Sequence, residues 1–165
     1  RTLSQVCDEI VVPGALPLPP ASRWRCVPDA AGAEGPIAGL IAGLEAAASP
    51  IAVVLACDLP LVPVALLRFL ADRCAEGYLA VVPFAMEHFH SLCAAYSRAL
   101  LPAMIEWVRS GRYSTCDLLR TLDDGVCVVD EGQLRQFGDP SIILLNVNSP
   151  ADLERARELL PLLGS

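Results

Sequence analysis

The chain has 165 residues, 54% of them hydrophobic, and a formal net charge of −7 at pH 7. This length suits one domain with a large buried core. The acidic balance argues against a nucleic-acid partner, because such binding needs a basic face. No run of about 18 apolar residues is free of proline and charge, so we expect no membrane-spanning helix, and the first residues do not resemble a signal peptide.

The chain begins at Arg1 and not at a methionine, which hints that residues upstream are absent. The next segments predict the end of a helix over residues 2–7, a short strand over 8–13, a proline-rich loop over 15–22 and a second strand over 24–27.

Gly35 and Pro36 indicate the start of a helix, because proline is tolerated at the first helical position. Gly39 and Gly43 lie on a second face of this helix, where they allow a neighbouring segment or a ligand to approach the backbone closely. Helical spacing predicts a buried stripe of Ile37, Leu40, Ile41 and Leu44.

Residues 51–57 form an uninterrupted apolar run that leads into Asp58, with Pro60 and Pro63 beyond it. Such a run predicts a strand buried on both faces, as in a parallel sheet covered by helices. Ligands of open α/β sheets bind outside the carboxyl ends of the strands, where Asp58 falls. The alternative for Asp58 alone is a polar loop residue or a helix cap.

The second half of the chain continues the alternation of strands and helices. Strands are predicted over residues 78–83, 92–96, 126–129 and 141–148, helices over 63–75, 97–109 and 114–122, and a loop over 85–90. Ser149 and Pro150 begin a last helix, whose apolar stripe is Leu153, Ala156, Leu159, Leu160 and Leu163. The connection within 79–96 is too short for a parallel crossover, so one strand there is antiparallel. The chain therefore predicts one three-layer α/β/α domain with a mostly parallel sheet.

The seven cysteines form no C-x-x-C pair, and most lie in apolar segments. They indicate reduced structural residues of a cytoplasmic protein, and not a disulfide or zinc framework. The seven are Cys7, Cys26, Cys57, Cys74, Cys93, Cys116 and Cys127.

Polar residues follow several predicted strands: Asp29, Asp58, and the pair Asn146 and Asn148. Carboxylate and amide oxygens suit Mg²⁺, whose other ligands are waters and substrate phosphates. Only one of the two asparagines can face such a cleft, since side chains alternate along a strand. The alternative is that both cap the turn before the last helix.

His88 and His90 are two residues apart, which places both on one face of a strand. Two ligands do not make a metal site and the chain has no third histidine, so a loop with polar contacts is the favoured interpretation. No complete phosphate-binding loop and no nucleophile motif is present.

Three strings in order resemble one family: Gly35-Pro-Ile-Ala-Gly39, Ala56-Cys-Asp-Leu-Pro60 and Asn146-Val-Asn-Ser-Pro-Ala-Asp-Leu153. This is the molybdenum cofactor guanylyltransferase family, whose strings read G-P-L-A-G, C-D-x-P and N-x-N-T-P-x-D-L. The segment from His90 to Tyr96 also looks like a family segment, with Ser91 in place of a proline. The resemblance implies the Rossmann-like, nucleotide-diphospho-sugar transferase-like fold.

It further implies Mg²⁺-dependent transfer of GMP from GTP to molybdopterin, with release of pyrophosphate. Asp58 would be the catalytic residue and would hold Mg²⁺, with Asn148 as a second ligand. Nucleotide-binding residues would be Asp29, Gly35, Pro36, Gly39 and Asp58, and the pterin side would be His90, Ser91 and Asn146. The implied partners are the two substrates and other proteins of molybdenum cofactor biosynthesis, with no nucleic acid and no membrane.

Two departures from the family stand out. The family's glycine-rich loop, L-x-G-G-x-S-x-R-M-G-x-D-K, has no counterpart, and all 12 basic residues here are arginine. Residues 1–165 would then be a single nucleotidyltransferase domain without its first strand, glycine-rich loop and most of its first helix. We expect an apolar gap in the sheet and no activity of this chain alone. The other departure is Pro13, where the family often carries asparagine.

Two alternatives remain. The first is the cytidylyltransferase of the same pathway, which differs in the base it selects. The second is a non-catalytic nucleotide-binding or interaction protein that keeps the fold without the phosphate loop.

Overall fold

The computed structural model describes residues 2–14 and 24–160. The expected loop over 15–22 and Leu163 of the last helix lie outside these ranges. Within them, no helix is long and apolar enough to cross a bilayer. All seven cysteines lie in these ranges and none of them forms a disulfide; Cys74 and Cys93 are buried, whereas Cys26 and Cys57 are exposed.

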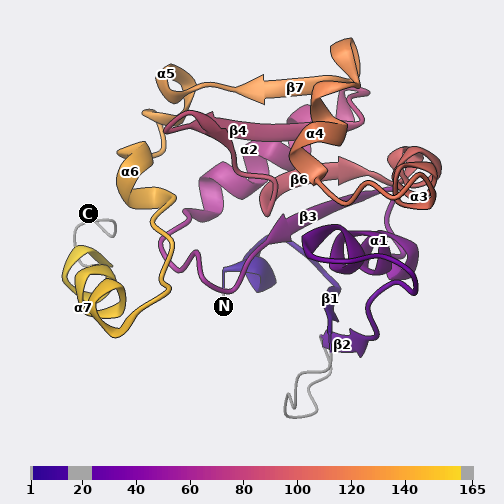
Figure 1. Ribbon diagram of the computed structural model, residues 1–165. Coiled ribbons are helices and arrows are strands. Elements are labelled where there is room, and N and C mark those ends of the chain that lie inside the picture. The colour runs from indigo at the N-terminus through magenta and orange to yellow at the C-terminus, as the bar shows by residue number, and fades with distance from the viewer. Residues whose placement is uncertain (1, 15–23, 161–165) are drawn as a thin grey trace.

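The described strands form two sheets (Figure 1). The smaller sheet pairs β1 (Ile10–Pro13) in parallel with β2 (Trp24–Val27). The larger sheet has the order β3 (Ile51–Leu55), β6 (Cys93–Ser97), β4 (Ala80–Ala85) and β5 (His88–Phe89), and β7 (Val126–Val129) pairs with β4. Because β6 is antiparallel to both β3 and β4, and β7 is parallel to β4, the strands β3, β4 and β7 share one direction. The expected antiparallel strand is therefore β6.

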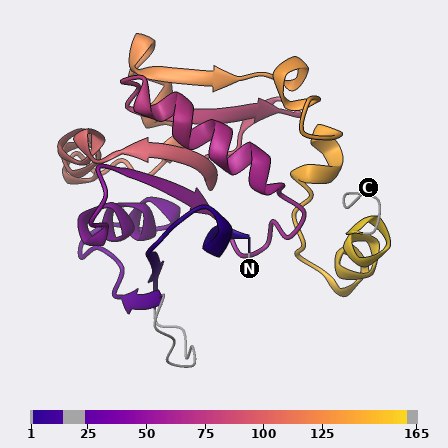
Figure 2. The same ribbon diagram turned by 180° about the vertical axis from the view of Figure 1, so that it is seen from behind.

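Helices cover both faces of the larger sheet, and Figure 2 shows α2 (Val64–Ala75) crossing one of them. Side chains of β4 alternate between the faces: Val81 and Ala85 pack with α2, whereas Ala80 and Val82 face the other core. That other core belongs to α1 (Pro36–Ala46), α3 (Leu101–Arg109) and α4 (Thr115–Arg120). The three-layer arrangement is confirmed.

The chain also forms smaller helical elements. These are 3₁₀ turns at Leu3–Gln5, Arg98–Leu100 and Asp123–Gly125, two short helices, α5 (Glu131–Leu134) and α6 (Pro140–Ile143), and the last helix, α7 (Pro150–Leu159). The helix expected over 2–7 is only the first of these turns. The loop expected over 85–90 contains a tight hairpin between β4 and β5.

The expectations for α1 are confirmed. Gly35 is its N-cap with φ 68°, a left-handed conformation that glycine adopts without strain, and Pro36 occupies the first turn. Its stripe is at most 4% exposed at Ile37, Leu40, Ile41 and Leu44. On the second face Pro13 lies against the two glycines: a Cβ built on Gly39 would be 3.4 Å from Pro13 Cβ, and one on Gly43 would be 3.6 Å from Pro13 Cγ.

The strand predicted over 141–148 is wrong. Asp139 caps α6 by accepting a hydrogen bond of 2.9 Å from the Ser141 amide, and Pro140 stands in the first turn. Ile143 is fully buried, in the core on the α2 side of the sheet. An apolar run of this length cannot be assigned to strand or helix by periodicity alone, and here the capping residues decide for helix.

The start of α7 is confirmed but its buried stripe is not. Ser149 and Asp152 form a reciprocal capping box. Ala156 is buried, yet Leu153 is 41% exposed and Leu160 is 57% exposed. Figure 1 shows the reason: α7 lies beside the sheet layers, next to α6, and not on a sheet face.

A large groove separates β1 from β3. Its cavity volume is about 910 Å³, and its lining is largely apolar, including Ile10, Val11, Leu40, Leu44, Val53 and Leu55. The two strands that border it are not paired with each other. The expectation that β3 is buried on both faces is therefore wrong for the described residues, since all five are only half-buried.

We expect Gly39→Val to lower the free energy of unfolding by about 1–3 kcal/mol, because its side chain would overlap Pro13 and the Asp29 carboxylate. The matched control is Gly43→Ala, whose Cβ makes ordinary contact and which should raise stability by about 0.5–1 kcal/mol. Urea midpoints of both variants check this; equal midpoints would contradict the close approach.

Candidate functional site

A cavity of about 410 Å³ lies at the carboxyl end of β3. It gathers four of the predicted site residues from distant segments: Asp58, His90, Ser91 and Asn146. Two backbone hydrogen bonds assemble it. The Ala56 amide donates to the Leu92 carbonyl over 2.8 Å, and the Val147 amide donates to the Asp58 carbonyl over 2.8 Å. The placement of Asp58 outside a strand end agrees with the position of ligands in α/β sheets.

One oxygen of the Asp58 carboxylate lacks a hydrogen-bond partner among the described residues. This oxygen, Oδ1, is buried. A buried carboxylate oxygen without a partner is costly, so this oxygen is available to a cation or to a donor group of a ligand. A carboxylate and the nearby Asn146 amide are hard oxygen donors, which is the chemistry that Mg²⁺ prefers.

Asn148 is placed differently. Its backbone amide donates to Asp152 Oδ2 over 3.2 Å at the start of α7, and it is not among the residues that line the cavity. In the part of the chain that the structure describes, no group of three or more His, Cys, Asp or Glu side chains is arranged to hold a metal ion. A magnesium ion here would depend on Asp58, with waters and substrate oxygens as its other ligands.

Of the five residues expected to bind the nucleotide, Asp58 lines this cavity and the other four line the groove. Asp29, Gly35, Pro36 and Gly39 all border the groove. The groove and the cavity, together called the two hollows, meet at the end of β3, since Ala56 and Leu92 line both of them. The groove and the cavity are therefore continuous with each other at this point.

The hairpin beside the cavity is strained. Its tip residues, Met86 and Glu87, have φ of 51° and 65°, in the left-handed region that such side chains rarely adopt. Glu131 Oε1 stabilises the tip by accepting a hydrogen bond of 2.9 Å from the Met86 amide. The sequence did not reveal this turn, because Met-Glu lacks the glycine or asparagine that usually indicates it.

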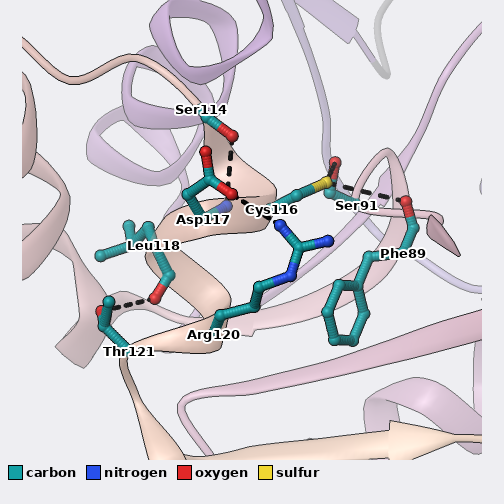
Figure 3. Close-up of polar contacts among 8 residues, drawn as sticks. All are labelled: Phe89, Ser91, Ser114, Cys116, Asp117, Leu118, Arg120 and Thr121. Carbon is teal, nitrogen blue, oxygen red and sulfur yellow. Dashed lines mark hydrogen bonds and ion pairs between the residues drawn. The ribbon is translucent and has the colours of Figure 1, made fainter.

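The segment after β5 is held from two sides. From β6, the buried Tyr96 hydroxyl donates to the Ser91 carbonyl over 2.7 Å, and burial raises the Tyr96 pKa. From α4, Cys116 Sγ lies 3.8 Å from the Phe89 carbonyl oxygen and 3.9 Å from Ser91 Oγ (Figure 3). Ser91 is therefore fixed on the cavity wall by contacts that the sequence did not indicate.

Helix α4 also covers the Phe89 ring. The Arg120 guanidinium lies 5.6 Å from the ring centroid and forms an ion pair of 2.6 Å with Asp117 (Figure 3). Ser114 begins the helix by accepting a hydrogen bond of 3.2 Å from the Asp117 amide. This exposed ion pair contributes little to stability by itself, so its role is to hold Arg120 over the ring.

Comparison with known proteins gives the family. Residues 1–126 match the model of the MobA-like NTP transferase domain. The chain belongs to this family. A curated relative, the probable molybdenum cofactor guanylyltransferase of Pelotomaculum thermopropionicum, is 35% identical over 133 residues, or 81% of this chain and 63% of that protein. The relative of the same description from Natronomonas pharaonis is also 35% identical and is likewise covered over 63% of its length.

Longer matches agree. The molybdenum cofactor guanylyltransferase of Desulfosudis oleivorans is 29% identical over 94% of this chain and 76% of its own length. Among solved structures, molybdopterin-guanine dinucleotide biosynthesis protein A from Archaeoglobus fulgidus has a TM-score of 0.69 at 27% identity, covering 82% of this chain and 68% of that one. A cytidylyltransferase from Thermus thermophilus, acting on 2-C-methyl-D-erythritol 4-phosphate, has a TM-score of 0.70 at 18% identity, which shows the shared fold alone.

His90 should remain neutral to low pH. Burial lowers its pKa to about 4, the neighbouring His88 adds to this, and the Ala85 backbone acts in the opposite direction. The folded pKa is below that of the unfolded chain, near 6.5, so stability is constant above about pH 6.5 and falls as the pH drops from there to 4.

NMR titration of the imidazole resonances checks this. The chain has 2 histidines, so in the His88→Gln variant the remaining imidazole signal is that of His90. A His90 midpoint near 6.5 in the folded protein would show that the ring is not buried as described.

Proposed function

We propose that this chain is the larger part of an enzyme that transfers GMP from GTP to molybdopterin and releases pyrophosphate. The observation that carries the proposal is the buried Asp58 oxygen without a partner among the described residues, which lies at the carboxyl end of β3 in a cavity continuous with the groove. Membership of the MobA-like family and the descriptions of the relatives support the choice of reaction.

In this proposal each wall of the two hollows has a role. Asp58 holds Mg²⁺ with Asn146 nearby, and the metal, when bound, neutralises phosphate charge during in-line attack on the α-phosphorus. Asp29 and the Gly35–Gly39 turn contact the nucleotide, because they border the groove. His90, Ser91 and Asn146 contact the pterin, because they share the Asp58 cavity. Asn148, expected as a second metal ligand, would need the loop before α7 to move.

We also propose that a strand outside residues 1–165 fills the part of the groove between β1 and β3 and completes one continuous sheet, which leaves the part bordered by Asp29 and Gly35 to the nucleotide. The groove supports this, because it lies between two unpaired strand edges and is lined by apolar side chains. The length of the relatives supports it as well, since the chain spans 63% of the first two. The described residues that line both hollows include no arginine, so residues 1–165 alone should bind triphosphate weakly and be inactive.

The free thiols agree with a reducing, cytoplasmic setting, and enzymes that deliver or receive the pterin cofactor are the proposed protein partners. CTP in place of GTP is the alternative closest to this proposal. The names of the curated relatives favour GTP.

We expect Asp58→Asn in the complete protein to lower kcat by about 10²-fold or more, because the neutral amide lacks the negative charge that would hold Mg²⁺, while the fold is retained. Asp124→Asn is the matched control, since Asp124 is exposed and lies in the turn before β7, at the other end of the parallel strands. Turnover is measured with GTP and with CTP at saturating Mg²⁺. Unchanged turnover in Asp58→Asn would favour a non-catalytic role, and a preference for CTP would replace the guanylyl assignment.

A second measurement tests the groove. Alternate amides of β3 point away from β6, and in residues 1–165 they should exchange with solvent quickly because no strand accepts their hydrogens. In the complete protein the same amides should be protected by at least about 100-fold. Equal exchange in both forms would mean that no strand enters the groove.

A further inference from the structure

The two histidines of the chain lie together beside the Asp58 cavity. His88 is in β5 and His90 follows it, so their side chains project to the same side, and their ring centroids are 4.2 Å apart at an interplanar angle of 41°. Both line the cavity. The pairing is not explained by the contacts proposed for GTP.

Each imidazole has a nitrogen available for coordination. His88 Nδ1 lies 2.9 Å from the Met86 carbonyl oxygen, which can only accept, so Nδ1 carries the hydrogen and Nε2 keeps its lone pair. His90 Nε2 is buried and has no partner among the described residues. In metal-binding histidines, one ring nitrogen commonly donates to a carbonyl and the other nitrogen holds the metal.

The backbone holds both rings in place. Glu131 accepts a hydrogen bond from the strained Met86–Glu87 turn, and the His90 amide donates to the Pro83 carbonyl over 2.9 Å. Strained turns of this kind persist where the surrounding structure determines them, and they occur at ligand sites. The backbone that carries the two imidazoles is therefore fixed before any ligand binds.

We propose that His88 and His90 bind one borderline transition-metal ion, of the class of Zn²⁺, Co²⁺ or Ni²⁺, through their Nε2 atoms. The described residues supply only these two imidazoles, so the remaining positions open into the cavity and are filled by water or by donor atoms of a molecule bound there. This site is separate from the one proposed for Mg²⁺, which needs oxygen ligands. It does not depend on the proposed nucleotidyl transfer.

The test is a titration of residues 1–165 with Co²⁺, in a buffer that contains excess Mg²⁺ and no nucleotide. The titrated protein carries Cys57→Ser, since Cys57 is exposed and next to Asp58. We expect one equivalent of Co²⁺ to bind with visible d–d absorption, and both Nε2 resonances to shift when Zn²⁺ replaces it in ¹⁵N NMR.

His88→Gln and His90→Gln should each weaken Co²⁺ binding by at least about 100-fold, whereas Asp124→Asn should leave it unchanged. His88 is exposed, so its variant separates loss of a ligand from loss of folding. The proposal is overturned by the absence of saturable binding, by thiolate charge-transfer absorption alone, or by binding that survives in both histidine variants. GTP affinity measured on the same variants in the complete protein reports independently on the nucleotidyltransferase proposal.

Discussion

The antiparallel pairing of β3 with β6 is the constraint on which both hollows depend. Five residue pairs fix its register, from Ile51 opposite Ser97 to Leu55 opposite Cys93. The Ala56–Leu92 hydrogen bond continues that register one step further. Asp58 then leaves the end of one strand just where the His90 segment enters the other. A slip by one residue would turn every side chain to the opposite face and separate the carboxylate from the imidazole.

The groove and the cavity carry acidic groups but no arginine among their described lining residues. The acidic groups include Asp8, Asp29, Asp58 and Asp72. Phosphate groups of a nucleotide would meet repulsion here unless cations or backbone amides were supplied. A metal ion is one source, and a further segment of protein is another. A phosphate ligand in the cavity therefore requires such groups to offset the acceptor oxygens that line it.

Much of this could be predicted from the sequence, wherever local signals and tertiary packing agree. The bounds of β2 and β7, the cap and stripe of α1, and the capping box of α7 each follow from residues within a few positions. The failures share a cause: burial depends on what lies alongside. Residues 141–148 are as apolar as a strand, but the Asp139 cap and Pro140 begin a helix there, and Ile143 of that helix is buried in the core on the α2 side of the sheet. The strand-end argument predicted that Asp58 and Asn146 lie together, and the resemblance to the family added His90 and Ser91. The Met86–Glu87 turn and the Cys116 contacts had no local signature.

The divided sheet has a consequence for how the chain assembles. Strands β3, β4 and β6 and helix α2 lie within residues 51–97, so their contacts close short stretches of chain and form early. The β1–β2 ribbon has no strand partner in that unit; it attaches through α1, with Glu9 accepting from both Arg25 and the Ala48 amide. It therefore behaves as a separate cooperative unit that docks last and detaches first. We therefore expect local unfolding to begin at the glycine face of α1, where Pro13 packs.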